Sequence, residues 1–537
     1  MKRSADMLLR RIKSLEKKND IIGAIGLCSE LLKLFPKNQN AIEIHEILKL
    51  ELLNNEAVIR NNMISQKMID DIVIAFQTEA YDQVLEKVRA LGDPIFLPSP
   101  LPSVIGMSLV KNNQASIGLP ILRQISQADE SNIDHLNTLA SAMKYVGEIE
   151  SAIKIYLKII NKQRMFSPAL FNLGNLYKET KDYDLAVAYY RRALEIDPHD
   201  IEYNLGLLGV LGEVEKVEKS IDLAIGLCIR YPNHVVINME LARLYELNLN
   251  YSEALKFYDK VYEITLQELK KTPNLIRLEH FRNRSIAKKL ECFIFLNQFD
   301  DLKRELLAVN ELYPNHIHVG AISVYLNHYL KYENLHNFCN NPIDFIRISN
   351  LSDLVQDYES FVSNLLCDVL RVNSKWEPSN KTTKSGYQSE SVVFANQAET
   401  IVSLERILRQ EICEYYDVFA DEKCAFIKNW PNKYNLKGWY VRLLTSGHQD
   451  SHIHPGGWLS GVVYLKTVDH INQNEGAIEF GVEGYNLPTI KGPAPSYIHN
   501  PKVGDIVLFP SSLFHKTIPF SGDQERCIIA FDIVPFC

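Results

Sequence analysis

The pattern of apolar and polar positions changes character near residue 336. Residues 1–335 read as helices and contain almost no strand signal. Further on, apolar residues recur at helical spacing over 397–419, and short β-type runs separated by Gly and Pro fill 438–534. The pattern predicts a multidomain α + β chain. Its helical domain covers 1–335, and its antiparallel barrel or jelly roll, with supporting helices, covers 336–537.

The helical part repeats itself with a period of 34 residues, most clearly at 167–200. Gly174 and Ala186 allow the two helices of this unit to approach closely, aromatic side chains fill the space to the next unit, and a proline ends the second helix. The window 133–166 repeats the pattern more weakly. The clear unit resembles the tetratricopeptide repeat at the positions Leu173, Gly174, Tyr177, Ala186, Tyr190, Ala193 and Pro198.

Repeats of this kind stack into a right-handed, curved solenoid. The resemblance implies that the concave face binds a protein or peptide ligand; a surface for oligomerisation and a passive scaffold remain open as alternatives. We expect Tyr177 and Tyr190 to be buried between neighbouring helices. The repeats identify neither the ligand nor the oligomeric state.

The β region carries histidines at a spacing that suits a metal ion. His452 and His454 are two residues apart, so in an extended strand both imidazoles point to the same side. His515 follows the apolar run Asp505–Pro510. Three imidazole ligands from two strand ends leave coordination positions open, as an iron that activates oxygen requires.

Arg526 stands at the start of the last β-type run, and a guanidinium inside a barrel requires an anion. A small dicarboxylate bound through two parallel hydrogen bonds would satisfy it. We expect Arg526 to lie on a strand beside the one that leads to His515, with its guanidinium directed towards the metal. A structural salt bridge to Asp505 or Glu479 is the alternative.

The stretch 438–534 resembles the catalytic domain of the 2-oxoglutarate/Fe(II)-dependent oxygenases, in a prolyl-hydroxylase-like branch that carries His-x-His-Pro followed by Ser-Gly-Val-x-Tyr-Leu. The resemblance implies a double-stranded β-helix, with Fe(II) as the metal and O2 and 2-oxoglutarate as co-substrates. It assigns His452, His454 and His515 to the metal, and Arg526 with Tyr464 to the far carboxylate of 2-oxoglutarate. Most members of the family have a carboxylate where this chain has His454.

Two sets of alternatives remain open. At the metal, His448 and Asp450 form a His-x-Asp pair just upstream, and Asp450 could also join a mixed ligand set. For the whole chain, the barrel could be a degenerate, non-catalytic fold beside a working repeat scaffold, or a cupin-like dioxygenase with three histidines and no co-substrate; Arg526 argues against the latter. The substrate, and hydroxylation rather than halogenation or another oxidation, are not determined by the sequence.

The net charge and the composition exclude some classes of binding partner. A net charge of −8 and a pI near 6.1 argue against a general surface for nucleic acid or anionic membrane. No apolar run reaches the ~18 residues of a membrane-spanning helix. The nine cysteines are scattered, without a Cys-x-x-Cys motif, as in a reducing compartment. We therefore expect a cytoplasmic protein that binds neither nucleic acid nor membrane.

Overall fold

The computed structural model describes residues 5–18, 20–49, 64–89, 91–112, 114–214, 217–272, 275–332, 335–378, 381–469, 473–488, 492 and 494–536. The chain divides into two compact units, Met1–Leu207 and Leu208–Cys537. This division follows packing and falls within the helical part of the chain. The boundary at residues 335/336 follows fold type and stays a prediction.

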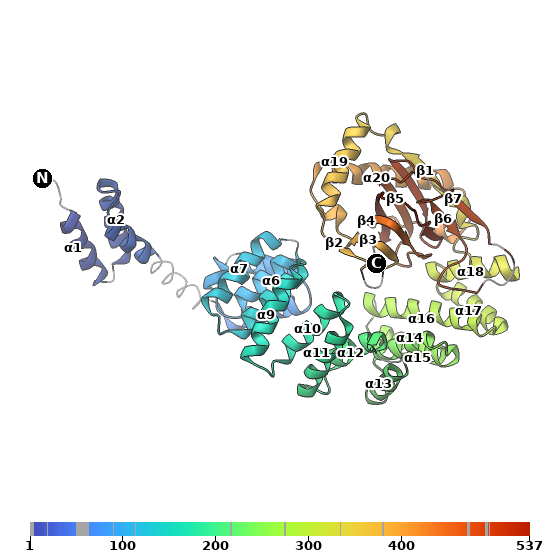
Figure 1. The fold of residues 1–537 in the computed structure, drawn as a ribbon, viewed down its shortest axis with the longest axis horizontal. Coiled ribbons are helices and arrows are strands. Elements are labelled where there is room, and N and C mark those ends of the chain that lie inside the picture. The colour runs from blue at the N-terminus through green and yellow to red at the C-terminus, as the bar shows by residue number, and fades with distance from the viewer. Residues whose placement is uncertain are drawn as a thin grey trace. The chain divides into compact units, whose positions relative to one another are not determined.

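Unit 1 is helical throughout the residues that are described, and consecutive helices pack against each other in pairs (Figure 1). Its helices are α1 (Ala5–Glu16), α2 (Ile21–Leu34), α4 (Gln66–Gln77), α5 (Tyr81–Val88), α6 (Leu101–Lys111), α7 (Ala115–Ala128), α8 (Ile133–Tyr145), α9 (Ile149–Lys162), α10 (Ser167–Glu179), α11 (Tyr183–Ile196) and the start of α12 (Ile201–Val214). Among the described residues of the whole chain, no helix is both long and apolar enough to cross a membrane.

Helices α10 and α11 show why the repeat needs small residues. A Cβ added at Gly174 would lie 2.7 Å from the ring of Tyr190, which is completely buried. The Tyr190 hydroxyl donates to the Asn175 side chain at 2.7 Å, so the buried phenol keeps a partner. Tyr177 is only half-buried and stacks on Tyr189 with ring centroids 5.4 Å apart. The expected burial is therefore right for Tyr190 and only partly right for Tyr177.

Unit 2 begins with further helices and ends in a β domain. The helices that precede the strands are α13 (Val217–Arg230), α14 (Val235–Leu247), α15 (Tyr251–Lys271), α16 (Ile276–Phe295), α17 (Phe299–Leu312) and α18 (Ile317–Leu330). Three more lie among the strands: α19 (Tyr358–Leu370), α20 (Glu399–Phe419) and the short α21 (Ala425–Lys428). Helix α20 is the one that apolar spacing over 397–419 predicts.

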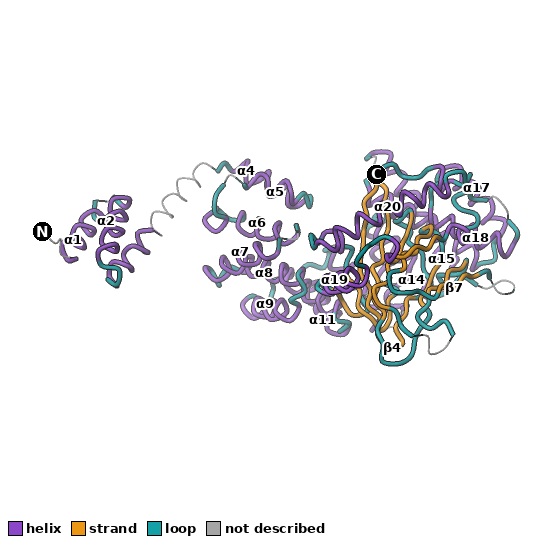
Figure 2. Tube along the Cα trace, turned by 90° about the horizontal axis from the view of Figure 1, so that it is seen from above, coloured by secondary structure: helices purple, strands orange, loops and turns teal. Residues whose placement is uncertain are grey.

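All strands in the described residues belong to unit 2 and pair antiparallel (orange in Figure 2). A seven-stranded sheet has the order β1-β8-β5-β10-β4-β3-β2, and a three-stranded sheet has the order β7-β6-β9. The strands are β1 (Arg347–Asn350), β2 (Ser374–Trp376), β3 (Thr383–Ser389), β4 (Tyr434–Gln449), β5 (Leu459–Lys466), β6 (Ile478–Gly481), β7 (Ser496–His499), β8 (Asp505–Pro510), β9 (Phe514–Thr517) and β10 (Arg526–Pro535). Two antiparallel sheets with supporting helices agree with the predicted fold class.

Strand β10 shows how the larger sheet separates its two faces. Ile529 and Phe531 pack into the core that helices α19 and α20 form with the sheet. Ile528 and Ala530, which alternate with them, belong to the core between the two sheets. Arg526 continues this second face, so a charged side chain points into the space that the sheets enclose.

The expected neighbour of the Arg526 strand is wrong. Strand β10 lies between β4 and β5, and β5 separates it from β8, which leads to His515. His515 itself lies on β9 of the smaller sheet. Strand order in an antiparallel sheet depends on long crossover connections, which the local pattern of residues does not record.

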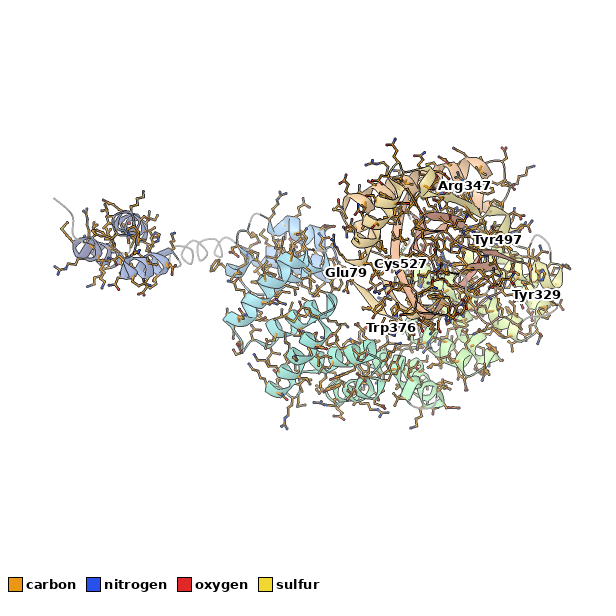
Figure 3. All side chains as sticks on the ribbon, turned by 45° about the horizontal axis from the view of Figure 1, so that its top comes forward. Glu79, Tyr329, Arg347, Trp376, Tyr497 and Cys527 are labelled. Carbon is orange, nitrogen blue, oxygen red and sulfur yellow. The ribbon has the colours of Figure 1, made fainter. Side chains whose placement is uncertain are left out.

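Helix α18 packs directly on the β domain. Ala321 shares a small buried cluster with Ile453 and Phe514. Both of these partners belong to the β domain: Ile453 lies in a loop, and Phe514 lies on strand β9. Two turns further along the helix, the Tyr329 hydroxyl donates to the Glu483 carboxylate (Tyr329 is labelled in Figure 3). The last helix of the repeat region therefore belongs to the same packed unit as the sheets.

Candidate metal centre

Three histidine rings meet where the two sheets approach each other. His452 and His515 form an isolated antiparallel bridge, in which each backbone N–H donates to the carbonyl of the other at 3.1 and 3.0 Å. The backbone N–H of His454 donates to the carbonyl oxygen of Ser511 at 3.0 Å, and this hydrogen bond fixes the backbone position of His454. The ring centroids lie 5.2, 4.3 and 5.0 Å apart, and one ligand nitrogen of each ring lies within 4.8 Å of the others.

Backbone carbonyls orient two of the rings. The Nδ1 of His452 lies 2.7 Å from the Asp450 carbonyl oxygen, and the Nδ1 of His515 lies 3.0 Å from that of Leu513. A carbonyl oxygen only accepts, so each Nδ1 carries the proton and donates. Each Nε2 is left with a lone pair, which is the form that binds a metal.

The third ring is held by a carboxylate. The Nδ1 of His454 lies 2.6 Å from Asp532 Oδ1, and the Ser460 hydroxyl donates to the same oxygen at 2.7 Å. The Ser511 hydroxyl lies 2.8 Å from that of Ser460 and extends the network. The carboxylate likewise places the proton of His454 on Nδ1 and leaves Nε2 for a ligand.

The site favours neutral imidazoles. Burial, and then the neighbouring His454 ring, lower the pKa of His452 to about 3. Burial and the other two rings hold the pKa of His515 well below its usual value. Both rings are therefore unprotonated at neutral pH, so a metal ion does not have to displace protons from them.

Arg526 is buried, with 1% of its surface exposed, and no carboxylate among the described residues pairs with it. Its Nη2 donates to the Tyr464 hydroxyl at 3.3 Å, and its guanidinium lies 5.0 Å from the centre of the same ring. In the part of the chain that the structure describes, its Nε and Nη1 have no hydrogen-bond partner. A buried cation with two unsatisfied donors is costly without an anion, so the site fits a carboxylate ligand.

The two salt bridges considered for Arg526 do not form. Asp505 pairs with His499 at 2.9 Å, and Glu479 pairs with Lys516 at 3.1 Å. Burial raises the pKa of the Tyr464 phenol, so its hydroxyl stays protonated and can donate to a ligand.

One pocket joins the metal ligands and the guanidinium. All three histidines and Arg526 line it. Its other walls are mostly apolar and come from both sheets: Trp439, Gln449, Val462, Ile478, Lys516, Thr517, Ile528 and Ala530. Three imidazole nitrogen donors suit a divalent transition metal such as Fe(II), and a guanidinium in the same pocket suits a ligand that carries a carboxylate. The residues present therefore fit both groups that the resemblance implies.

The alternative pair His448 and Asp450 lies outside the group of three. Their side chains approach each other at 3.5 Å, and the Asp450 side chain is 58% exposed. Asp450 contributes to the site through its backbone carbonyl, which orients His452. Asp532 was not identified from the sequence as the partner of His454, although it lies an even number of positions from Arg526 and so shares one strand face with it. That shared face was the available signal.

Comparison with known proteins agrees with this geometry. Residues 437–532 match the family described as "Putative 2OG-Fe(II) oxygenase", and residues 167–200 match the tetratricopeptide repeat. The chain therefore combines a C-terminal domain of the 2-oxoglutarate/Fe(II) oxygenase type with a tetratricopeptide repeat. No curated protein matches it.

Several solved structures of MamA match about a third of this chain. A crystal structure of MamA is 18% identical over 31% of this chain and 97% of its own, with a TM-score of 0.29. MamA from Desulfovibrio magneticus RS-1, from residue 41 to its end, is 17% identical over 34% of this chain and 99% of its own, with the same TM-score of 0.29. Likenesses this distant do not bear on function.

Proposed function

We propose that this chain is a 2-oxoglutarate- and Fe(II)-dependent dioxygenase that hydroxylates a protein or peptide recruited by its repeats. One observation carries the proposal: a buried guanidinium, two of whose donors have no partner among the described residues, shares a pocket with three converging imidazoles. The three imidazoles alone would also suit other metalloproteins, and the buried guanidinium alone would also suit other anion-binding sites. Together they match the two ends of a co-substrate that chelates iron at one end and carries a carboxylate at the other.

Each residue has a definite part. The Nε2 atoms of His452, His454 and His515 would hold Fe(II), and Arg526 with the Tyr464 hydroxyl would bind the far carboxylate of 2-oxoglutarate. When bound, iron and 2-oxoglutarate supply the oxidising chemistry that activates O2. The apolar walls of the pocket keep water away from the reacting groups.

The alternatives account for less of the site. A three-histidine dioxygenase without co-substrate would leave the Nε and Nη1 of Arg526 unpaired. A non-catalytic barrel gives no reason for three Nδ1 atoms to be held while the opposite nitrogens converge. The repeat match at 167–200 favours a protein or peptide as the recruited substrate. A cytoplasmic location remains part of this proposal.

Calorimetry with 2-oxoglutarate and the Mn(II)-loaded full chain tests the proposal. Arg526→Ala should lower the affinity for 2-oxoglutarate by about 100-fold or more, because the ligand carboxylate loses a buried, charged partner. Arg526→Lys should bind 2-oxoglutarate more tightly than Arg526→Ala but less tightly than the unmodified chain, since lysine keeps the charge and loses the two parallel hydrogen bonds. Mn(II) affinity should not change in either variant.

Arg442→Ala is the matched control, because Arg442 lies on the neighbouring strand β4 and pairs with Glu525. It should bind 2-oxoglutarate as the unmodified chain does. Equal affinity in Arg526→Ala and the unmodified chain would exclude the anchoring role. A chain that binds Mn(II) but no 2-oxoglutarate, and releases no succinate with cell extract, would contradict the proposed activity.

A further inference from the structure

We infer that Asp532 is a positioning residue that supplies, through His454, the negative charge that the three neutral ligands lack. The inference rests on the proposed metal centre and deepens it. Three imidazoles bring no charge to a divalent ion. Asp532 is one hydrogen bond removed from the site, at 2.6 Å from the Nδ1 of His454.

The three ligand rings differ in what holds their Nδ1 atoms. His452 and His515 donate to backbone carbonyls, which are neutral. Within the residues described, His454 is the one of the three that donates to a carboxylate. An imidazole whose N–H is held by a carboxylate is the more basic ligand, so the metal–nitrogen bond of His454 should be the strongest of the set.

The surrounding backbone and side chains fix the position of the Asp532 carboxylate that contacts His454. Asp532 on β10 lies directly opposite Ser460 on β5 in the sheet, and the serine hydroxyl donates to the same carboxylate oxygen at 2.7 Å. Asp532 is 9% exposed. A Cβ added at Gly457 would lie 2.9 Å from its carboxyl carbon, so the turn after His454 closes tightly over it.

The charge of Asp532 is not used by another cation. In the described part of the chain its contact with a basic side chain is the hydrogen bond from His454, and no lysine or arginine pairs with it. A buried carboxylate without a second cation acts with little screening on the ion beyond the ring. This arrangement stabilises a bound divalent ion more than it stabilises the empty site.

Titration of the full chain with Co(II), followed by visible absorption, measures the effect without relying on activity. Asp532→Asn keeps an oxygen that can accept from Nδ1 and removes only the charge. It should weaken Co(II) binding about 10- to 100-fold. Asp532→Ala removes charge and acceptor and should weaken it further. Ser460→Ala keeps the charge and should change the affinity much less than Asp532→Asn does.

Asp505→Asn is the control, because Asp505 is also a buried carboxylate paired with a histidine, His499, at 2.9 Å. It should bind Co(II) as the unmodified chain does. Co(II) affinity of Asp532→Asn equal to that of the unmodified chain would overturn the inference. Weak Co(II) binding by Asp505→Asn as well would also overturn it, because the effect would then be general.

A second measurement does not depend on how a variant folds. In the zinc-loaded, unmodified chain labelled with ¹⁵N-histidine, one of the three ligand Nδ1–H protons should resonate far downfield of the other two, because a carboxylate accepts it. Three similar shifts would overturn the inference. Failure of the proposed function is distinguishable: a chain that binds Co(II) with this Asp532 dependence but binds no 2-oxoglutarate keeps the inference and loses the oxygenase.

Discussion

The tripeptide His-Ile-His occurs twice in this chain, at residues 316–318 and 452–454, and the two copies have opposite roles. The first copy begins helix α18. His316 caps that helix: its Nδ1 accepts from the backbone N–H of Val319 at 3.3 Å, and its Nε2 donates to the Asn283 carbonyl at 2.9 Å. Both nitrogens of His316 are therefore occupied.

His318 lies inside the helix and turns to a different partner. Its Nε2 lies 2.8 Å from the Glu291 carboxylate, which also binds Lys288 at 2.7 Å. In the second tripeptide His452 forms a backbone bridge with His515, and one nitrogen of each of its two rings converges with one of His515. The spacing is identical, and the backbone conformation decides whether it makes a ligand pair or two structural contacts.

The two carboxylates near these copies differ in the same way. The charge of Glu291 is taken up by Lys288, whose pKa the acidic neighbours hold above its usual value. The charge of Asp532 is shared with no lysine or arginine in the described residues. In this chain, the carboxylate that contacts the candidate ligand His454 has no lysine or arginine partner among the described residues, whereas the carboxylate that contacts His318 has one.

Replacing one histidine in each His-Ile-His tripeptide should give the largest difference in metal affinity. His454→Ala should lower Co(II) affinity by roughly 1,000-fold, more than the 10- to 100-fold typical of residues behind the ligands. His318→Ala should leave Co(II) affinity unchanged, because its ring faces Glu291. Competition with a chelator of known affinity measures both. Similar losses in the two variants would remove the distinction between the copies.

Glu291→Ala tests the structural role of the first copy. Glu291 is 2% exposed, and its removal leaves Lys288 with Glu246 as its remaining carboxylate partner at 2.9 Å. Breaking a buried ion pair costs about 3–5 kcal/mol, and the second partner places the expected loss of unfolding free energy near ~3 kcal/mol. Urea denaturation measures this loss, while Co(II) affinity should stay constant. Glu405→Ala, which breaks an exposed pair with Arg409, should cost less than about 1 kcal/mol.

His316 should make stability depend on pH. Burial is the main cause that lowers its pKa to about 3, below the ~6.5 of an unfolded histidine. Between these values the unfolded chain binds a proton that the folded chain does not, so stability falls as pH falls, by up to about 1.4 kcal/mol per pH unit. His316→Asn keeps a helix cap and removes this proton, so between pH 6 and pH 5 it should lose about 1 kcal/mol less than the unmodified chain.

Urea denaturation of the metal-free chain at both pH values checks this expectation. His199→Asn, a change at an exposed histidine, serves as the control and should follow the unmodified chain. Equal pH dependence of His316→Asn and the unmodified chain would contradict the assignment.

The sequence allowed prediction of what depends on local pattern. The repeat spacing around Gly174 and the helix over 397–419 follow from periodicity and appear as α10–α11 and α20. The convergence of His452, His454 and His515 was expected from the alternation of side chains along a strand, and it occurs although His452 is an isolated bridge residue and His454 lies in no strand.

What the sequence did not predict depends on which strands become neighbours. The partnership of His454 with Asp532 spans 78 residues and exists because β10 pairs with β5 in one particular register. The neighbour of the Arg526 strand was misjudged for the same reason. Tyr177 is less buried than expected because its ring stacks on Tyr189 instead of entering the core.

The contact of helix α18 with the site has a thermodynamic consequence. Ile453, which lies between two of the candidate ligands, and Phe514, which precedes the third, share one buried cluster with Ala321 of the helix. An ion that binds only the folded site stabilises it by about 2.7 kcal/mol at a hundredfold excess over its Kd. Because helix α18 and the ligand loops cannot separate without exposing that cluster, binding of a metal ion at the three histidines should also stabilise helix α18 against unfolding.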